Sequence, residues 1–210
     1  MESSVCPLCS SYSALFYKKD ETYYRCSSCY SIFEDEKDRP DIVSERERYE
    51  LHDNNVEDLG YQKFVSPITS HILEDFDKES LGLDFGAGTG PVLSKVLLDH
   101  DYVIKQYDPF FHNDLKLLEK KYDYIASCEV IEHFYNPYKE FSLLKNMMKS
   151  GSKLYLMTEL YSNKIDFSSW YYKNDPTHVF FYTKETFNWI KKEFCFNDLK
   201  IDKRLIVLTN

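Results

Sequence analysis

The sequence lacks the segments that would place it in a membrane. Its 210 residues contain no run of about 18 apolar side chains, the length that a membrane-spanning helix requires. The first residues, MESSVCPLC, have neither the basic start nor the apolar centre of a secretion signal. These two absences predict a cytoplasmic protein without a membrane partner.

The chain also lacks an excess of positive charge. It has 26 Lys and Arg against 35 Asp and Glu, which gives a formal net charge of −9. Nucleic-acid-binding proteins usually present a basic face. Within residues 1–33, the positive and negative side chains cancel. Nucleic acid is therefore not the expected partner.

Two common nucleotide-binding motifs are missing. There is no G-x-x-x-x-G-K-[ST] segment and no G-x-G-x-x-G segment, which argues against a nucleoside triphosphate site and a dinucleotide site. The segment LGLDFGAGTG, residues 81–90, instead runs from a short apolar strand into a glycine-rich turn. Glycine permits positive φ and lets a ligand approach the bare backbone. Gly86, Gly88 and Gly90 therefore indicate a ligand site, with a purely connecting turn as the alternative.

Cysteine is concentrated at the start of the chain, in two Cys-x-x-Cys pairs. Each pair directs two thiolates at one centre, and two pairs complete a tetrahedral zinc site. Strands around ALFY and TYYR predict a hairpin between the pairs. We expect the zinc to be structural, because four thiolates leave no open position and so short a module has little core of its own. The predicted ligands are Cys6, Cys9, Cys26 and Cys29.

The two remaining cysteines lie in apolar sequence. Cys128 follows YIAS and Cys195 follows KEF. Free cysteine behaves as a small hydrophobic residue. We expect both thiols to be buried in the core and unreactive.

After the cysteine module, predicted strands alternate with predicted helices. Helix starts are expected at Pro67, with Ser66 as cap, at Asn136–Pro137 and at Thr183. This alternation predicts an α/β fold with a mostly parallel sheet and helices on both faces. The expected division is a zinc-ribbon-like module at residues 1–38, a linker and lid helix at 39–65, and the main domain at 66–210.

Ligands of such sheets bind beyond the carboxyl ends of the strands. Three groups are predicted to meet there: the glycine turn, Asp108, and the segment from Glu129 to His133. Asp108 follows the glycine turn by about 20 residues, where a carboxylate accepts hydrogen bonds from both ribose hydroxyls. A simple turn residue before Pro109 is the alternative.

These residues resemble the class I S-adenosylmethionine-dependent methyltransferases over roughly residues 64–210. LGLDFGAGTG, the acid in QYDPF, and SCEVIEHF followed by an amphipathic helix and KLYLMTEL carry the resemblance. It is closest to the small-molecule enzymes that include the quinone-biosynthesis O-methyltransferases. It implies a Rossmann-like fold with a seven-stranded type of sheet, S-adenosylmethionine as methyl donor and a small-molecule acceptor. Bacterial relatives with a cysteine-rich head include enzymes of small metabolites and one group that modifies ribosomal RNA.

The resemblance also implies individual roles. Asp84 would orient the glycine turn or receive the ammonium group of the donor, and Glu129 would line the wall near its sulfonium. The segment between Asp108 and Tyr122 is too short for a full strand–helix unit, which leaves Asp114 as the candidate for adenine. The implied donor-binding residues are Asp84, Gly86, Ala87, Gly88, Gly90, Asp108, Pro109 and Glu129.

Two histidines are candidates for the base that accepts a proton from the methyl acceptor. His133 is the first choice and His178, in an aromatic segment, is the second; a loop histidine bonded to backbone is the alternative for His133. Glu129, Glu132 and His133 are a possible divalent-cation group, as in the quinone enzymes that this segment resembles.

The segment before the main domain is either a solvated connection or a lid. As a lid, it would turn Arg48, Tyr49, His52 and Tyr61 toward the cleft. Two other functions are weighed against small-molecule methylation: an RNA methyltransferase whose ribbon docks RNA, and a non-catalytic protein that senses the donor.

Overall fold

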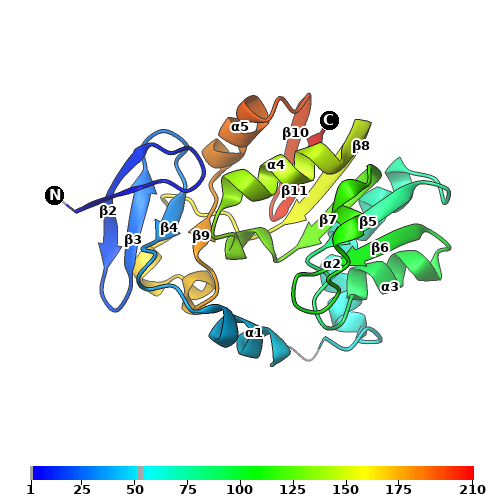
Figure 1. The fold of residues 1–210 in the computed structure, drawn as a ribbon, viewed down its shortest axis with the longest axis horizontal. Helices are drawn as coiled ribbons and strands as arrows, with labels where there is room; N and C mark the ends of the chain where they lie inside the picture. The colour runs from blue at the N-terminus through cyan, green and yellow to red at the C-terminus, as the bar shows by residue number, and fades with distance from the viewer. Residues whose placement is uncertain (1, 52–53) are drawn as a thin grey trace.

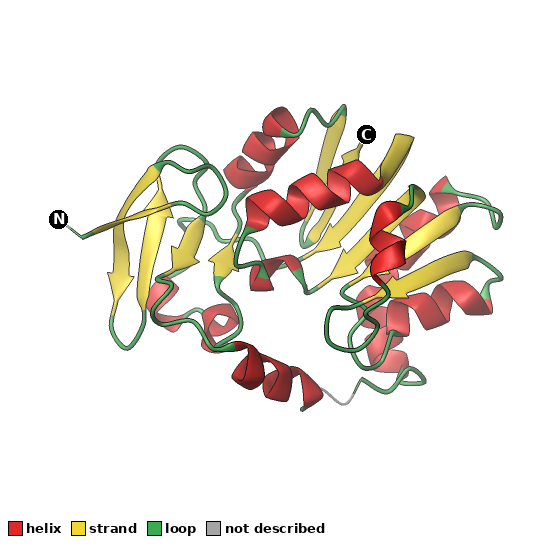
Figure 2. Cartoon of the chain, in the orientation of Figure 1, coloured by secondary structure: helices red, strands yellow, loops and turns green. Residues whose placement is uncertain are grey.

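Two sheets organise the protein in this computed structural model, which describes residues 2–51 and 54–210 (Figures 1 and 2). The larger sheet has the strand order β10-β11-β8-β7-β5-β6. Its strands are β5 (Leu81–Phe85), β6 (Val103–Tyr107), β7 (Tyr122–Cys128), β8 (Met148–Met157), β10 (Asp198–Asp202) and β11 (Leu205–Thr209).

The pairing in this sheet confirms the predicted α/β fold. β5 is parallel to β6 and β7, β7 is parallel to β8, and the hairpin of β10 and β11 adds antiparallel strands beside β8. Six strands are described where the resemblance implied seven. Residues 108–121 form a loop and the short 3-10 helix η1 (Leu115–Glu119). That length allows one crossover of about a dozen residues, and not a further strand with a second crossover.

Helices cover both faces of the larger sheet, because neighbouring residues in a strand point to opposite faces. β7 sends Tyr124 into one hydrophobic core and Ile125 into the other. The first core is covered by α2 (Leu59–Asp75) and α3 (Val92–Asp99), and the second by α4 (Pro137–Met147) and α5 (Lys184–Glu193). The predicted caps of α4 and α5 are confirmed, since Asn136 and Thr183 each accept a backbone N–H.

The predicted start of α2 is wrong. The helix begins at Leu59, where Asp58 accepts hydrogen bonds from the backbone N–H groups of Gly60 and Tyr61, and Pro67 lies inside it. Proline has no N–H to offer the carbonyl four residues earlier. The Ser66 hydroxyl donates to that carbonyl, of Lys63, at 2.7 Å. Ser66 was expected to cap the first turn. It instead lies inside the helix and supplies the hydrogen bond that Pro67 cannot make.

The smaller sheet joins the cysteine module to the main domain. Its order is β1-β2-β3-β4-β9, and the predicted hairpin is confirmed as β2 and β3. β4 pairs antiparallel with β9, which lies between β8 and α5 in the chain. Figure 1 shows these two strands side by side. The strands are β1 (Ser3–Val5), β2 (Tyr12–Lys18), β3 (Thr22–Cys26), β4 (Ile32–Glu34) and β9 (Phe180–Phe181).

The remaining helix, α1 (Ile42–Glu50), lies between the two sheets in the chain. Asp41 caps it by accepting from the N–H groups of Val43 and Ser44. Among the helices of the described residues, none has the length and apolar character needed to cross a bilayer.

The shared sheet generates a prediction about stability. Phe33 is 1% exposed, and its ring centroid lies 5.9 Å from that of Tyr24 and 6.4 Å from that of Phe180. We expect Phe33→Ala to lower the free energy of unfolding by about 3–5 kcal/mol, because a large cavity replaces the ring. Urea unfolding followed by circular dichroism measures this. Tyr12→Ala, at a side chain that is 80% exposed, is the control and should change the value by about 0.5 kcal/mol or less. A loss of about 0.5 kcal/mol or less in Phe33→Ala would contradict a core shared by the cysteine module and the main domain.

Candidate functional site

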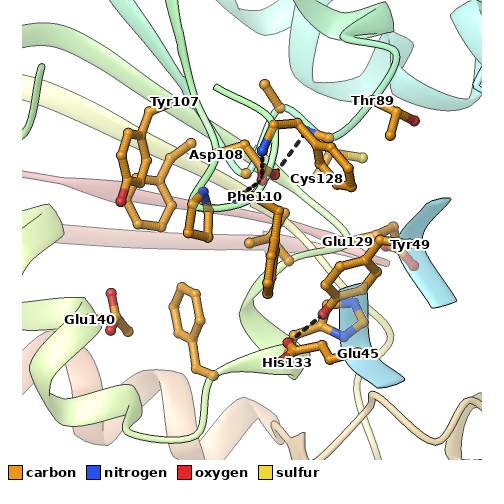
Figure 3. A pocket seen from close by; sticks show the side chains of 18 of the residues that line it. Glu45, Tyr49, Thr89, Tyr107, Asp108, Phe110, Cys128, Glu129, His133 and Glu140 are labelled. Carbon is orange, nitrogen blue, oxygen red and sulfur yellow. Dashed lines mark hydrogen bonds between the residues drawn. The ribbon is translucent and has the colours of Figure 1, made fainter. Parts of the chain in front are cut away.

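A cavity of about 720 Å³ opens at the carboxyl ends of β5, β6 and β7 (Figure 3). The turns after these three strands form much of its wall, and the rest comes from α1, the start of α2 and the segment before it, α4, and the segment before β9. Gly86, Ala87, Gly88, Asp108, Pro109, Glu129, His133 and His178 all line it, as the sequence predicted for a single site.

The glycine turn is shaped by close neighbours. Gly86 and Gly88 have φ values of +84° and +64°, where glycine is favoured. A Cβ on Gly86 would lie 2.4 Å from the side chain of Val130, and one on Gly90 would lie 1.8 Å from the backbone oxygen of Asn54. Gly86 and Gly88 thus present backbone to the cavity, while Gly90 makes room for the segment before α2.

Two carboxylates hold this turn. Asp84 is buried below it and accepts a hydrogen bond from the Ser94 hydroxyl at 2.7 Å; burial raises its pKa to about 6. Asp108 accepts from the N–H of Gly88 at 3.0 Å, and from those of Phe110 and Phe111 at 2.8 and 3.1 Å. Asp108 therefore stands at the cavity wall between two loops (Figure 3), and Asp84 ties β5 to α3.

Glu129 lies directly after β7 in the left-handed region, with φ +54°. Its carboxylate forms an ion pair with Arg204 and accepts from the Tyr172 hydroxyl at 3.2 Å. Burial and the neighbouring Glu132 raise the pKa of Glu129 to about 8, and Arg204 opposes the shift. A strained backbone and a desolvated carboxylate are typical of functional sites.

His133 and His178 meet at this end of the cavity, with ring centroids 4.8 Å apart. Their Nδ1 atoms lie 2.8 Å from the carbonyl oxygen of Thr177 and 2.7 Å from that of Tyr172. A carbonyl oxygen only accepts, so each Nδ1 carries a proton, and in the neutral form of each ring the lone pair is on Nε2. Burial lowers the pKa of His178, which favours the neutral ring. His133 does not belong to the strand itself: β7 stops at Cys128, and residues 131–133 form a 3-10 turn.

Glu132 is fully buried behind these histidines. Its carboxylate accepts hydrogen bonds from the hydroxyls of Tyr172 and Thr158. Donor atoms of Glu132, His133 and His178 lie within 4.8 Å of one another. Glu129, which was predicted to belong to this group, lies outside it, and His178 is the third member instead. A divalent cation at this point stays a prediction.

α1 covers part of the cavity. The Tyr49 ring centroid lies 5.3 Å from that of His133 and 5.7 Å from that of Phe110. Arg48 does not line the cavity but forms an ion pair with Asp175 at 2.7 Å. His52, predicted to face the cleft, lies outside the described residues. Tyr49 and Tyr61 line the cavity as predicted for a lid.

Several residues that line the cavity or pair with a lining residue had no signal in the sequence. Glu45 and Asn54 come from the connecting segment, and Glu140 comes from the first turns of α4. Arg204, which pairs with Glu129, comes from the turn between β10 and β11. None belongs to a local motif, because each reaches the site only through tertiary contacts.

The four N-terminal cysteines converge. The Sγ atoms of Cys6 and Cys29 are 3.5 Å apart, those of Cys9 and Cys26 are 3.3 Å apart, and all four lie within 4.8 Å of one another. A tetrahedral zinc with Zn–S bonds of about 2.3 Å requires Sγ atoms about 3.8 Å apart. The donor set and its geometry thus fit zinc.

The burial predicted for the other two cysteines is corrected. Cys195 is exposed at the end of α5, because the chain turns there toward β10. Cys128 is half-buried and lines the cavity, where burial raises the pKa of its thiol.

Comparisons with known proteins bear on this cavity. A family model described as a methyltransferase domain matches residues 59–201. No curated protein matches significantly.

Several solved structures have a similar fold. A SAM-dependent methyltransferase from Archaeoglobus fulgidus is 17% identical, with 71% of this chain and 94% of that chain covered and a TM-score of 0.56. Magnesium protoporphyrin IX methyltransferase from Synechocystis is 15% identical, with 80% and 94% covered and a TM-score of 0.55. Human N-acetylserotonin methyltransferase is 13% identical, with 80% and 65% covered and a TM-score of 0.52. At these identities the likeness is one of fold.

Proposed function

Because this chain belongs to the methyltransferase domain family, we propose that it transfers a methyl group from S-adenosylmethionine to an oxygen, nitrogen or carbon atom of a small-molecule metabolite. The observation that carries the proposal is one cavity that brings together the open glycine backbone, the Asp108 carboxylate and two histidines. The glycine turn fits the extended amino-acid part of the donor, and Asp108 fits the two hydroxyls of its ribose.

Methyl transfer mainly requires that the protein align the acceptor atom with the methyl group of the donor. The sulfonium of the donor supplies a methyl group that is already activated for displacement. The protein has to hold the acceptor atom at about 3–3.5 Å from the reacting carbon and exclude water. Tyr49 packs against Phe110 and His133 at the cavity wall, which limits the access of water to the histidines, and Asp108 would hold the donor. His133 or His178 accepts the acceptor's proton on Nε2, while its Nδ1–H stays bonded to a carbonyl oxygen.

The charges that face the cavity disfavour RNA as acceptor. Glu45, Asp108 and Glu140 line it, against Lys139. Carboxylates repel a phosphate backbone, whereas RNA-binding surfaces collect Lys and Arg. A small neutral or cationic acceptor meets no such repulsion.

We also propose that Cys6, Cys9, Cys26 and Cys29 hold a structural zinc ion, which their geometry supports. Four thiolates would fill its coordination sphere, so the ion would stabilise the head without taking part in methyl transfer.

Donor binding tests the proposed function. Calorimetry of the full chain with S-adenosylmethionine is expected to show micromolar binding. Asp108→Ala removes the ribose acceptor, and Gly88→Val adds a β-branched side chain at φ +64°, so both should weaken binding by at least about tenfold. Asp20→Ala, on the exposed turn of the head, is the control and should bind like the parent. Absence of binding by the folded parent chain would overturn the proposal.

The base is identified by exchanging each histidine for glutamine. With an acceptor found by screening phenols and amines against labelled donor, loss of the base should lower kcat by about 10²–10⁴-fold. Affinity for S-adenosylhomocysteine should change little, because the ring acts on the acceptor. His71→Gln, on the exposed side of α2, controls for loss of an imidazole. If His133→Gln and His178→Gln both keep the parent's kcat, neither is the base.

Zinc content tests the head. The purified parent is expected to carry one zinc per chain by elemental analysis. Cys26→Ser should lose the metal and unfold at lower urea, because a structural site contributes directly to folding. Cys195→Ser, at an exposed thiol, should keep both metal and stability. A Cys26→Ser chain that stays fully loaded and equally stable would exclude this role for the site.

A further inference from the structure

The cavity has two chemically different ends. Figure 3 shows Tyr49, Glu129 and His133 at one end, Tyr107 and Glu140 at the other, and Asp108 between them. The first end holds the polar groups that accept protons or pair with cations. The second end is aromatic: the Phe85 ring centroid lies 5.4 Å from that of Tyr107 and 6.3 Å from that of Phe134.

Glu140 is the acid of the aromatic end. It is half-buried on α4, and burial raises the pKa of its carboxyl group while Lys139 lowers it. Within residues 2–51 and 54–210, no side chain forms a hydrogen bond or an ion pair with this carboxylate. A carboxylate that is partly desolvated and unpaired is costly, and a ligand that donates to it would recover that cost.

Asp114, the residue that the sequence suggested for adenine, is placed elsewhere. It is exposed and caps η1 by accepting from the Lys116 N–H at 3.1 Å. It lines a separate hollow beside Lys105 and Lys120. It therefore does not face the cavity.

We propose that the aromatic end receives the base of the donor's nucleoside and that Glu140 accepts a hydrogen bond from its 6-amino group. This inference rests on the proposed function. Asp108 in the middle of the cavity fixes the ribose, so the base and the sulfonium must point to opposite ends. The sulfonium belongs beside the histidines, where the acceptor is deprotonated. The base then lies against Phe85, Phe134 and Tyr107, whose rings suit a planar heterocycle.

Because the connection between β6 and β7 is short, α4 is the element that supplies the acid for the base. With only η1 between these strands, α4 packs directly against the connection and forms the side wall of the cavity. Glu140 and Leu143, one turn apart on the same helix face, both line it. The amino group of the base meets the carboxylate, and an apolar edge meets the leucine.

The test compares two ligands that differ in one group. S-adenosylhomocysteine has a 6-amino donor, and S-inosylhomocysteine has a 6-oxo acceptor that a carboxylate repels. By calorimetry on the full chain, the parent is expected to bind the adenosyl compound at least about tenfold more tightly, as for a hydrogen bond to a charged group. Glu140→Gln should reduce this preference to about onefold to threefold, since its amide can donate to the oxo group. Asp114→Asn is the matched control and should keep the parent's preference.

The outcomes distinguish failure of the Glu140 assignment from failure of the proposed function. Equal binding of both ligands by the parent, or an unchanged preference in Glu140→Gln, would overturn the assignment of Glu140 while leaving the proposed function intact. If Asp114→Asn loses the preference for the adenosyl compound and Glu140→Gln keeps it, then Asp114, and not Glu140, accepts the hydrogen bond from the 6-amino group. A folded parent that binds neither ligand would instead refute the proposed function. The parent comparison needs no variant, so a folding defect in Glu140→Gln does not remove the test.

Discussion

The antiparallel pairing of β4 with β9 is the contact on which the arrangement of the cavity wall depends. The Glu34 N–H donates to the Val179 carbonyl at 2.9 Å, and the Val179 N–H donates to the Glu132 carbonyl at 3.0 Å. These bonds connect the cysteine head to the turn that carries His133. Phe33 and Phe180 fill the core beneath the same pair of strands. The head is therefore connected, through β4 and β9, to the segment that stands behind the histidines.

Behind that wall, buried acids are held by hydroxyl groups. Glu132 accepts from Tyr172 and Thr158, and Glu129 pairs with Arg204 from a distant hairpin. Removing a carboxylate from water is costly, and each additional donor reduces that cost. The same donors fix the position of both carboxylates. Their oxygen atoms therefore stand at set positions beside the two histidines, where they can orient the side chains that face the cavity.

The sequence predicts the parts of this protein that depend on neighbouring residues. The glycine turn, Asp108, the two cysteine pairs and the caps Asn136 and Thr183 all have local causes. The structure places the turn and Asp108 at one cavity, the four cysteines together and the caps at the starts of α4 and α5, as predicted. The start of α2 was missed because Pro67 favours a first turn, whereas the Ser66 hydroxyl lets this helix continue through it. Glu140 and Arg204 could not be found, because only the folded chain brings α4 to the cavity and the last hairpin to Glu129.

The charge of the cavity wall favours binding of the positively charged donor over binding of the neutral product. S-adenosylmethionine, as the proposed donor, bears a positive sulfonium, and the acids of the cavity wall attract it within a chain of net charge −9. Methyl transfer turns the sulfonium into a neutral sulfide, so the product loses that attraction while the ribose and base contacts remain. Under the two proposals, product affinity would depend on Asp108 and the aromatic end, and donor affinity would depend on these and on the acids near the histidines. The two ends of the cavity would then separate recognition of the nucleoside from recognition of the reacting charge.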